Sequence, residues 1–216
     1  MKFITLDTEL LEIRQNAALI MQIVIPRPIA LISTLTANGV LNLAPFSYFQ
    51  VVSVNPLAVG FSATRDRHGG AKQTHVNIRG IAEFVAAMVT EDMAERMNIT
   101  SAEFPPGVSE FEKAGFTAGN AEVVKPSLIM EAPVNMECKV IEIVELSDSP
   151  MGGTFVIGKV VRVHFKEGVY DQEAQKIRSE NYKLISRLGG SAYGYVRDQF
   201  DMPRPMLDSD GDVIQG

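Results

Sequence analysis

The chain has 216 residues, 46% hydrophobic and 21% charged, a composition typical of a globular protein with a sizeable core rather than a disordered chain. Its formal net charge of -6, with no Lys/Arg cluster, argues against nucleic-acid binding. The single cysteine, Cys138, excludes a disulfide within the chain and argues against cysteine-based zinc or iron–sulfur sites.

Neither a targeting segment nor a membrane span is expected. The first residues contain no uninterrupted apolar run of signal-peptide length, and no segment approaches the roughly 20 apolar residues that cross a bilayer. His68, His75 and His164 lie too far apart in sequence to form a recognisable metal motif. We therefore expect a soluble cytoplasmic protein that contacts no membrane and holds no metal.

The chain is expected to begin with one helix, which is followed by short β-type runs. The helix is expected over residues 9–23, and Pro26 and Pro28 prevent its continuation. Asn38-Gly39 between apolar segments predicts a hairpin turn, because both residues tolerate a positive φ. The runs that predict strands here are residues 29–36, 46–52, 57–62 and 83–89.

Three further helices are expected from their start signals. Thr74 is expected to cap a short helix that ends near Gly80. Thr90, followed by two acidic residues, opens a second helix, since the macrodipole favours acids in a first turn. Ser109 and Glu112 have the spacing of a capping box and predict a third.

The second half of the chain adds two long strands, expected over residues 134–144 and 154–165. Many strands at short spacing with few helices predict a mainly β fold, a β-barrel with short helices, rather than a doubly wound parallel sheet. No linker divides the chain. We predict one domain over residues 1–200 and a C-terminal tail over residues 201–216.

The segment Gly69-Gly70-Ala71-Lys72-Gln73-Thr74 resembles a phosphate loop only in part. A nucleotide-binding loop requires a glycine directly before the lysine and Ser or Thr directly after it, and both are absent. A simpler phosphate site remains possible, in which Lys72 supplies charge and Thr74 and nearby amides face an anion. An ordinary capped surface helix with a nearby lysine is the alternative.

No catalytic acid–base or nucleophile set stands out. Cys138 is expected to be a small core residue, His75 a surface residue, and His164 exposed or satisfied within the sheet. This absence is compatible with a redox enzyme, because the cofactor then carries the chemistry and the protein supplies binding and orientation. We predict no catalytic side chain.

An ordered series of short motifs resembles the flavin reductase-like family of FMN-binding split barrels, especially its flavoredoxin-like branch. The resemblance covers roughly residues 20–195, and the number of ordered matches makes it far more specific than any single motif. The matching motifs include Arg27-Pro28, Ser33-Thr34, Asn42-Leu43-Ala44-Pro45, Ser47-x-Phe49, Asn55-Pro56, Phe61-Ser62, Lys72-x-Thr74, Asn77-Ile78, Pro106-Gly107-x-Ser109-Glu110 and Arg187-x-Gly189-Gly190-x-x-Tyr193.

The resemblance implies an antiparallel FMN-binding split barrel, usually a homodimer, with FMN near the subunit interface. It implies that Lys72 and Thr74 hold the phosphate and that Arg27 and Tyr193 border the site. The residues implied to line the flavin and its ribityl chain are Ser33, Thr34, Asn42, Ala44, Ser47, Phe49, Phe61 and Ser62. Gln73 departs from the common Lys-Asp-Thr pattern, and the loop at residues 65–70 is unusual, which leaves nicotinamide access open.

The function implied by the resemblance is that of an NAD(P)H-dependent oxidoreductase of flavin reductase type. NADH or NADPH would be the electron donor, and a free flavin, a metal complex or a redox partner protein the acceptor. An FMN-binding electron carrier or flavin store without nicotinamide activity is the first alternative. A barrel that has lost its ligand and serves as an interaction module is the second, and the retained Ser33, Asn42, Ser47, Lys72 and Thr74 argue against it.

Overall fold

The computed structural model describes residues 1–105, 107–209 and 211–214, so Pro106 of the motif series and residues 210, 215 and 216 of the predicted tail lie outside the described residues. The α-helices are α1 (Ile13–Ile23), α2 (Gln73–Ile81), α3 (Ala94–Ile99) and α4 (Glu110–Ala114), and the 3-10 turns are η1 (Thr8–Leu10), η2 (Glu91–Met93) and η3 (Ser179–Asn181). The larger strands are β2 (Ala30–Leu35), β3 (Leu41–Phe46), β4 (Phe49–Val54), β5 (Leu57–Thr64), β6 (Glu83–Met88), β9 (Val134–Glu145) and β10 (Gly153–Phe165). The short strands are β1 (Arg27–Pro28), β7 (Ala118–Gly119), β8 (Leu128–Ile129), β11 (Tyr170–Asp171), β12 (Lys176–Ile177), β13 (Ile185–Arg187), β14 (Tyr193–Tyr195), β15 (Met206–Leu207) and β16 (Val213–Ile214).

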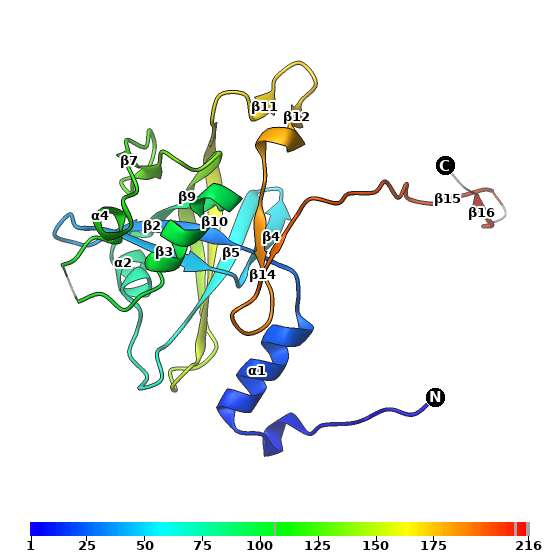
Figure 1. The fold of residues 1–216 in the computed structure, drawn as a ribbon, viewed down its shortest axis with the longest axis horizontal. Helices are drawn as coiled ribbons and strands as arrows, with labels where there is room; N and C mark the ends of the chain where they lie inside the picture. Colours follow the sequence, from blue (N-terminus) through cyan, green and yellow to red (C-terminus); the bar gives the residue numbers. More distant parts are fainter. Residues whose placement is uncertain (106, 210, 215–216) are drawn as a thin grey trace.

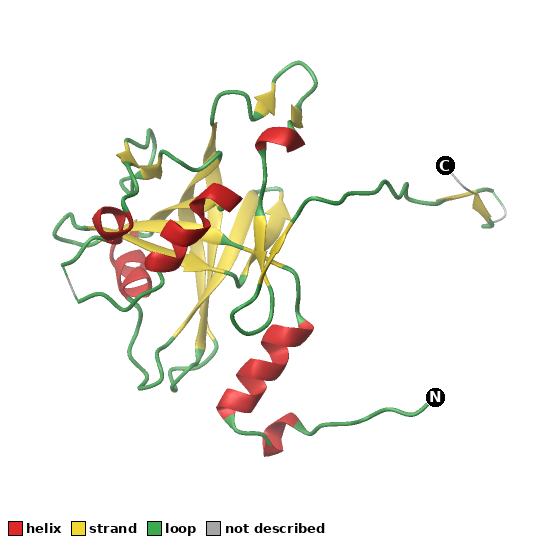
Figure 2. Ribbon diagram, in the orientation of Figure 1, coloured by secondary structure: helices red, strands yellow, loops and turns green. Residues whose placement is uncertain are grey.

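One seven-stranded sheet, in the order β3-β2-β6-β9-β10-β5-β4, makes up the body of the molecule (Figures 1 and 2). All of its pairings are antiparallel. The sheet curls until strands from its two sides meet, and the rings of Phe46 on β3 and Phe61 on β5 lie 4.8 Å apart between centroids. The predicted mainly β, antiparallel architecture is therefore confirmed.

The hairpin predicted at Asn38-Gly39 joins β2 to β3, with Gly39 at a φ of 82°. Most predicted strands form within a few residues of their expected bounds. The strand β3 was not predicted, and the strand expected over residues 46–52 begins only at Phe49. The expected helix over residues 9–23 is a 3-10 turn followed by α1, which starts at Ile13.

Buried side chains fill both faces of the sheet. Successive residues of β2 alternate between two clusters, with Ile32 in one and Leu31 in the other. The inner cluster includes Phe46, Phe61 and Cys138, and it receives Ile78 from α2. Cys138 is fully buried, as predicted. Because β2 is covered on both faces, its sequence is continuously apolar over its first residues.

The predicted cap of α2 is wrong, and that of α4 is confirmed in position but lacks its side-chain hydrogen bond. Lys72, not Thr74, is the N-cap of α2. The Thr74 hydroxyl donates to Asn42 on β3 instead of capping the helix. Ser109 precedes α4, but its side chain makes no capping hydrogen bond. In α2, a tertiary partner therefore replaced the local bond that the sequence pattern favours.

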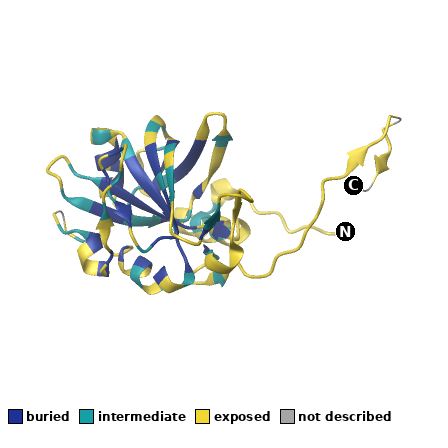
Figure 3. Ribbon diagram, turned by 90° about the horizontal axis from the view of Figure 1, so that it is seen from above, coloured by how far each residue is buried: buried dark blue, intermediate teal, exposed yellow. Residues whose placement is uncertain are grey.

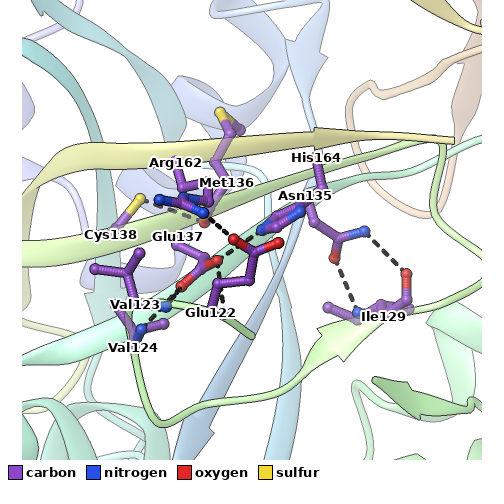
Figure 4. Close-up of polar contacts among 10 residues, drawn as sticks. All are labelled: Glu122, Val123, Val124, Ile129, Asn135, Met136, Glu137, Cys138, Arg162 and His164. Carbon is purple, nitrogen blue, oxygen red and sulfur yellow. Dashed lines mark hydrogen bonds and ion pairs between the residues drawn. The ribbon is translucent and has the colours of Figure 1, made fainter. Parts of the chain in front are cut away.

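A second layer, the segment from residue 117 to residue 132, packs over the outer face of β6 and β9. The Glu137 carboxylate on β9 is fully buried and accepts hydrogen bonds from the amides of Glu122, Val123 and Val124 (Figure 4). His164 Nε2 on β10 lies 2.6 Å from the same carboxylate, so this histidine is satisfied within the sheet. The buried carboxylate thus replaces the missing strand partners of the segment.

Figure 4 shows a second anchor beside Glu137. The Asn135 side chain, also on β9, exchanges two hydrogen bonds with the backbone of Ile129. Asn135 and Glu137 stand two residues apart and therefore project from the same face of the strand. Together they hold the outer segment at two places, Glu137 at residues 122–124 and Asn135 at Ile129.

Both ends of the described chain project away from the body (Figures 1 and 3). Helix α1 buries none of its residues, and the chain from Val196 to Ile214 is exposed wherever it is described. The buried Arg27 guanidinium ties α1 to the body by donating to the carbonyls of Met21 and Val24. Among the described residues, no helix is long and apolar enough to cross a membrane.

Candidate functional site

A cavity of about 330 Å³ lies where the outer edge of β3, the N-terminus of α2 and the segment from residue 100 to residue 110 meet. Its size falls within the roughly 300–1,000 Å³ range of small-molecule sites. Both polar and apolar side chains line it. The lining residues used below are Val40, Leu41, Asn42, Ala44, Asp66, Lys72, Gln73, Thr74, Glu103, Phe104, Val108 and Glu110.

A buried hydrogen-bond network joins α2 to the β2–β3 hairpin beside this cavity. Asn42 Oδ1 accepts from the hydroxyls of Thr34 at 3.0 Å and Thr74 at 3.1 Å. Asn77 Nδ2 donates to Thr34 Oγ1 at 3.0 Å, and Gln73 in turn donates to Asn77 Oδ1 at 2.7 Å. The network therefore fixes the first turn of α2 against the hairpin.

The N-terminus of α2 supplies positive potential to the cavity. The first two amides of a helix have no partner within the helix, and those of Gln73 and Thr74 donate to no described residue. The Lys72 ammonium lies 5.9 Å from the centre of the Phe46 ring and makes no ion pair with a described residue. A cation beside free helix amides is an arrangement that binds anions.

The carboxylates at the cavity differ in their hydrogen bonds and in their exposure to solvent. Asp66 accepts from the amides of His68 and Gly70, and these bonds, with Gly70 the stronger, hold the pKa of its carboxyl below the ordinary value. Glu103 is exposed, whereas Glu110 is buried and accepts from the Leu43 amide at 3.0 Å.

His75, expected at the surface, is buried in the first turn of α2. Its Nε2 accepts from Arg79 Nε at 2.7 Å, and Arg79 also pairs with Glu145 at 2.8 Å. Burial, followed by the neighbouring charge of Arg79, lowers the pKa of His75. The prediction of a surface histidine is wrong because the first turn of α2 packs its side chain inward.

Five of the predicted site residues gather at the cavity or in the network beside it. They come from β2, β3 and the start of α2. These residues are Thr34, Asn42, Ala44, Lys72 and Thr74.

Four other predicted residues lie in or near the core. Ser33 is fully buried and projects from β2 opposite to Thr34, and its hydroxyl has no partner among the described residues. Phe61 packs between Phe46 and Phe84, whereas Phe49 pairs with Phe61 across β4 and β5. Ser62 is half-buried beside them.

Arg27, Ser47 and Tyr193 form a third group, at the three-stranded sheet β1-β13-β14. Arg27 Nε lies 3.5 Å from Ser47 Oγ. Arg27 pairs with Arg187 and Arg187 with Tyr193 in register, and the exposed Tyr193 ring lies under the Arg187 guanidinium at 4.4 Å. The predicted residues therefore occupy three places, of which the first lies at the cavity described above.

Sequence reasoning gave no site role to Asn77 or Glu110. Both residues belong to motifs of the family resemblance, Asn77 to Asn77-Ile78 and Glu110 to Pro106-Gly107-x-Ser109-Glu110. The signal that could have identified both is their polarity at helix positions that face the body. The cation and the free amides at the start of α2, together with the polar groups of β3, suit a ligand that carries an anionic group and hydrogen-bonding groups.

The sheet, its closure and this site define a member of the split-barrel class. Residues 21–199 match the model of the flavin reductase like domain, and the chain belongs to the flavin reductase-like family. Its fold is the antiparallel split barrel expected from the sequence.

Solved structures agree with this assignment. Nitrilotriacetate monooxygenase component B from Bacillus cereus superposes with a TM-score of 0.88 at 34% identity, covering 94% of this chain and 100% of that one. The 2-nitrobenzoate 2-nitroreductase NbaA of Pseudomonas fluorescens gives a TM-score of 0.84 at 31% identity, over 96% and 100% of the two chains. A split-barrel protein of Shewanella frigidimarina shares the fold at 22% identity, with a TM-score of 0.79 over 94% and 100%.

Proposed function

We propose that the protein is an FMN-dependent oxidoreductase of the flavin reductase type. The observation that carries this proposal is the cavity at the start of α2, where Lys72 and two free helix amides stand beside the buried Asn42–Thr74 bond. The residues fit FMN, because this end of the cavity suits a phosphate and the polar groups of β3 suit the rest of the ligand.

Each part of the site has a separate task in this proposal. Lys72 and the amides of Gln73 and Thr74 hold the phosphate, and Asn42 contacts the ligand beside them. Thr34 holds Asn42 in place through its hydroxyl. When bound, FMN supplies the capacity to accept a hydride from NADH or NADPH and to pass electrons on.

The apolar part of the lining has a different task. Val40, Leu41, Phe104 and Val108 face the cavity, and they would exclude water from the ligand. We propose no proton transfer by the side chains that line this cavity.

The acceptor is proposed to be a free flavin, a metal complex or a partner protein. One similar structure is named as a component of a monooxygenase and another as a nitroreductase. We also propose a cytoplasmic homodimer. Exposed apolar side chains on α1 and the sheet edge β4, including Ile20, Ile23, Val51 and Val54, support it, since such clusters mark protein contacts.

A flavin titration followed by nicotinamide addition tests the function. The purified protein is titrated with FMN, its visible absorption is recorded, and NADH or NADPH is then added without oxygen. Bound flavin whose absorption bleaches supports the reductase. No FMN binding, or no bleaching with either nicotinamide, would overturn it.

The loop at residues 65–70 favours one alternative, an FMN-binding electron carrier. Asp66 closes the loop on itself, and Arg65 Nη1 donates to the Gly69 carbonyl while Nη2 pairs with Glu145. A loop fixed at the cavity in this way could restrict nicotinamide. Bound FMN that is reduced by a redox partner protein but not by NADH or NADPH would identify the carrier.

A further inference from the structure

Glu110 connects helix α4 to the free edge of the sheet. It is the first residue of α4, and only 9% of it is exposed. Strand β3 ends the sheet, so the Leu43 amide has no strand partner on its outer side and donates to Glu110 Oε2 at 3.0 Å. This bond protects the sheet edge, and it also places the carboxylate in the wall of the cavity.

Only half of this carboxylate is used within the described protein. Oε1 of Glu110 accepts no hydrogen bond from a described residue. Among the carboxylates named above in the lining, Glu103 is exposed and Asp66 uses Oδ1 for two amides of its own loop, whereas Glu110 is the one bonded to the sheet edge. Oε1 of Glu110 is not among the buried side-chain atoms that lack a partner, so this oxygen is open at the cavity and retains its capacity to accept a hydrogen bond.

A complementary donor lies one residue away on β3. Asn42 Oδ1 is occupied by the hydroxyls of Thr34 and Thr74, whereas its Nδ2 donates to no described residue. Asn42 directly precedes Leu43, whose amide binds Glu110. The cavity wall thus carries a free amide donor and a free carboxylate acceptor close together. A hydroxyl group matches this pair, because it accepts one hydrogen bond and donates another.

We propose that Glu110 and Asn42 bind a hydroxyl of the ligand, and that Glu110 selects for a polyol chain attached to the phosphate. The inference rests on the proposed FMN function, since the ribityl chain of FMN carries such hydroxyls. The negative charge of Glu110 also disfavours a phosphate beside it, whereas the positive charge of Lys72 favours one. The ligand is therefore oriented with its phosphate at Lys72 and its chain along β3.

Calorimetric titration of Glu110→Gln tests the proposal. Glutamine keeps an oxygen for the Leu43 amide but turns the cavity-facing atom from an acceptor into a donor. FMN and riboflavin, which share the ribityl chain, should bind this variant about tenfold more weakly than the wild type. Lumiflavin, which lacks the chain, should bind both proteins equally. Glu112→Gln, an exposed position of the same helix, is the matched control and should bind FMN normally.

Unchanged affinity of Glu110→Gln for FMN would overturn the inference while leaving the proposed function intact. An equal loss for lumiflavin would also overturn it, because the effect would then not depend on a hydroxyl. Failure of the wild-type protein to bind FMN would overturn the proposed function and this inference with it.

A second measurement does not depend on the folding of any variant. FMN analogues that each lack one ribityl hydroxyl are titrated into the wild-type protein. One of them should bind about tenfold more weakly, since a site built to bind a hydroxyl rejects the analogue that lacks it. Equal affinity for all of the analogues would overturn the proposal.

Discussion

Thr74 Oγ1 donates to Asn42 Oδ1 across 3.1 Å and joins the start of helix α2 to strand β3. Thr74 is 1% exposed, so the bond is shielded from water. The same contact that organises the candidate phosphate site therefore also holds two elements of the fold together. Changes at Thr74 should act on stability and on binding at once.

Thr74→Val removes the hydroxyl and keeps the shape of the side chain. We expect a loss of about 1–2 kcal/mol in the free energy of unfolding, because a buried hydrogen bond is lost. FMN affinity should fall as well. Urea unfolding and FMN titration measure the two effects. Thr74→Ser, which keeps the hydroxyl, is the control, and equal FMN affinity of the valine variant would contradict the assignment of Thr74.

Lys72→Gln removes the cation and should affect binding more than stability, because Lys72 is exposed. FMN affinity is expected to fall roughly tenfold and to lose part of its dependence on salt. Riboflavin, which has no phosphate, should bind the variant as it binds the wild type. Lys113→Gln, at an exposed position of α4, controls for net charge. An equal loss for riboflavin would count against a phosphate contact.

Glu137 should make stability depend on acid pH. Burial raises the pKa of its carboxyl, but hydrogen bonds from His164 and from the amides of Val123 and Val124 outweigh burial and hold the pKa below its ordinary value of 4.5. A lowered folded-state pKa means that the ionised group stabilises the fold above the ordinary value. This contribution is lost as the pH falls through the lower, folded-state pKa.

Glu137→Gln tests this pH dependence. It should lower the free energy of unfolding by about 3 kcal/mol at neutral pH, because the Val124 amide, two further amides and His164 lose a charged partner. The difference in the free energy of unfolding between the variant and the wild type should become smaller as the pH falls into the acid range. Thermal unfolding as a function of pH measures it, with the exposed Glu142→Gln on the same strand as control. A difference that stays constant into acid would refute the role of the charge.

Cys138 should be unreactive in the folded protein. Its side chain is fully buried, and this burial raises the pKa of the thiol. A thiol reagent at neutral pH is expected to modify it only as fast as the protein unfolds. Adding urea should release rapid modification. Fast labelling of the native protein would show that the inner core cluster opens without unfolding.

The fold could be predicted largely because local patterns and tertiary structure agree. Asn38-Gly39 forms the expected hairpin, and Cys138 lies on a buried strand face as its neighbours predict. Strand β3 escaped prediction because Asn42 and Pro45 interrupt its apolar pattern. Both residues are tolerated there since β3 is an edge strand, where proline costs no ladder bond on the outer side.

The candidate site could be predicted only in part. Residues in contiguous motifs, such as Lys72 and Thr74, could be predicted as site residues, because the whole motif lies within one short segment of the sequence. Asn77 and Glu110 act through partners far away in sequence, Asn77 on Thr34 and Glu110 on Leu43. No local pattern encodes such partners. The expected capping role of Thr74 failed for the same reason, since its partner is Asn42.

The attachment of helix α1 has a consequence for how the surface of this protein can change. The helix buries no side chain, yet the carbonyls of Met21 and Val24 near its end are held by the single guanidinium of Arg27. The exposed side chains of α1 can therefore be exchanged with little effect on the barrel itself, and a change at Ile20 or Ile23 would act on the proposed subunit contact instead. The direction in which α1 points depends instead on Arg27, which also donates to the Leu188 carbonyl, and on the close approach of Gln22 to Gly189, so a substitution at either contact would act on the whole helix.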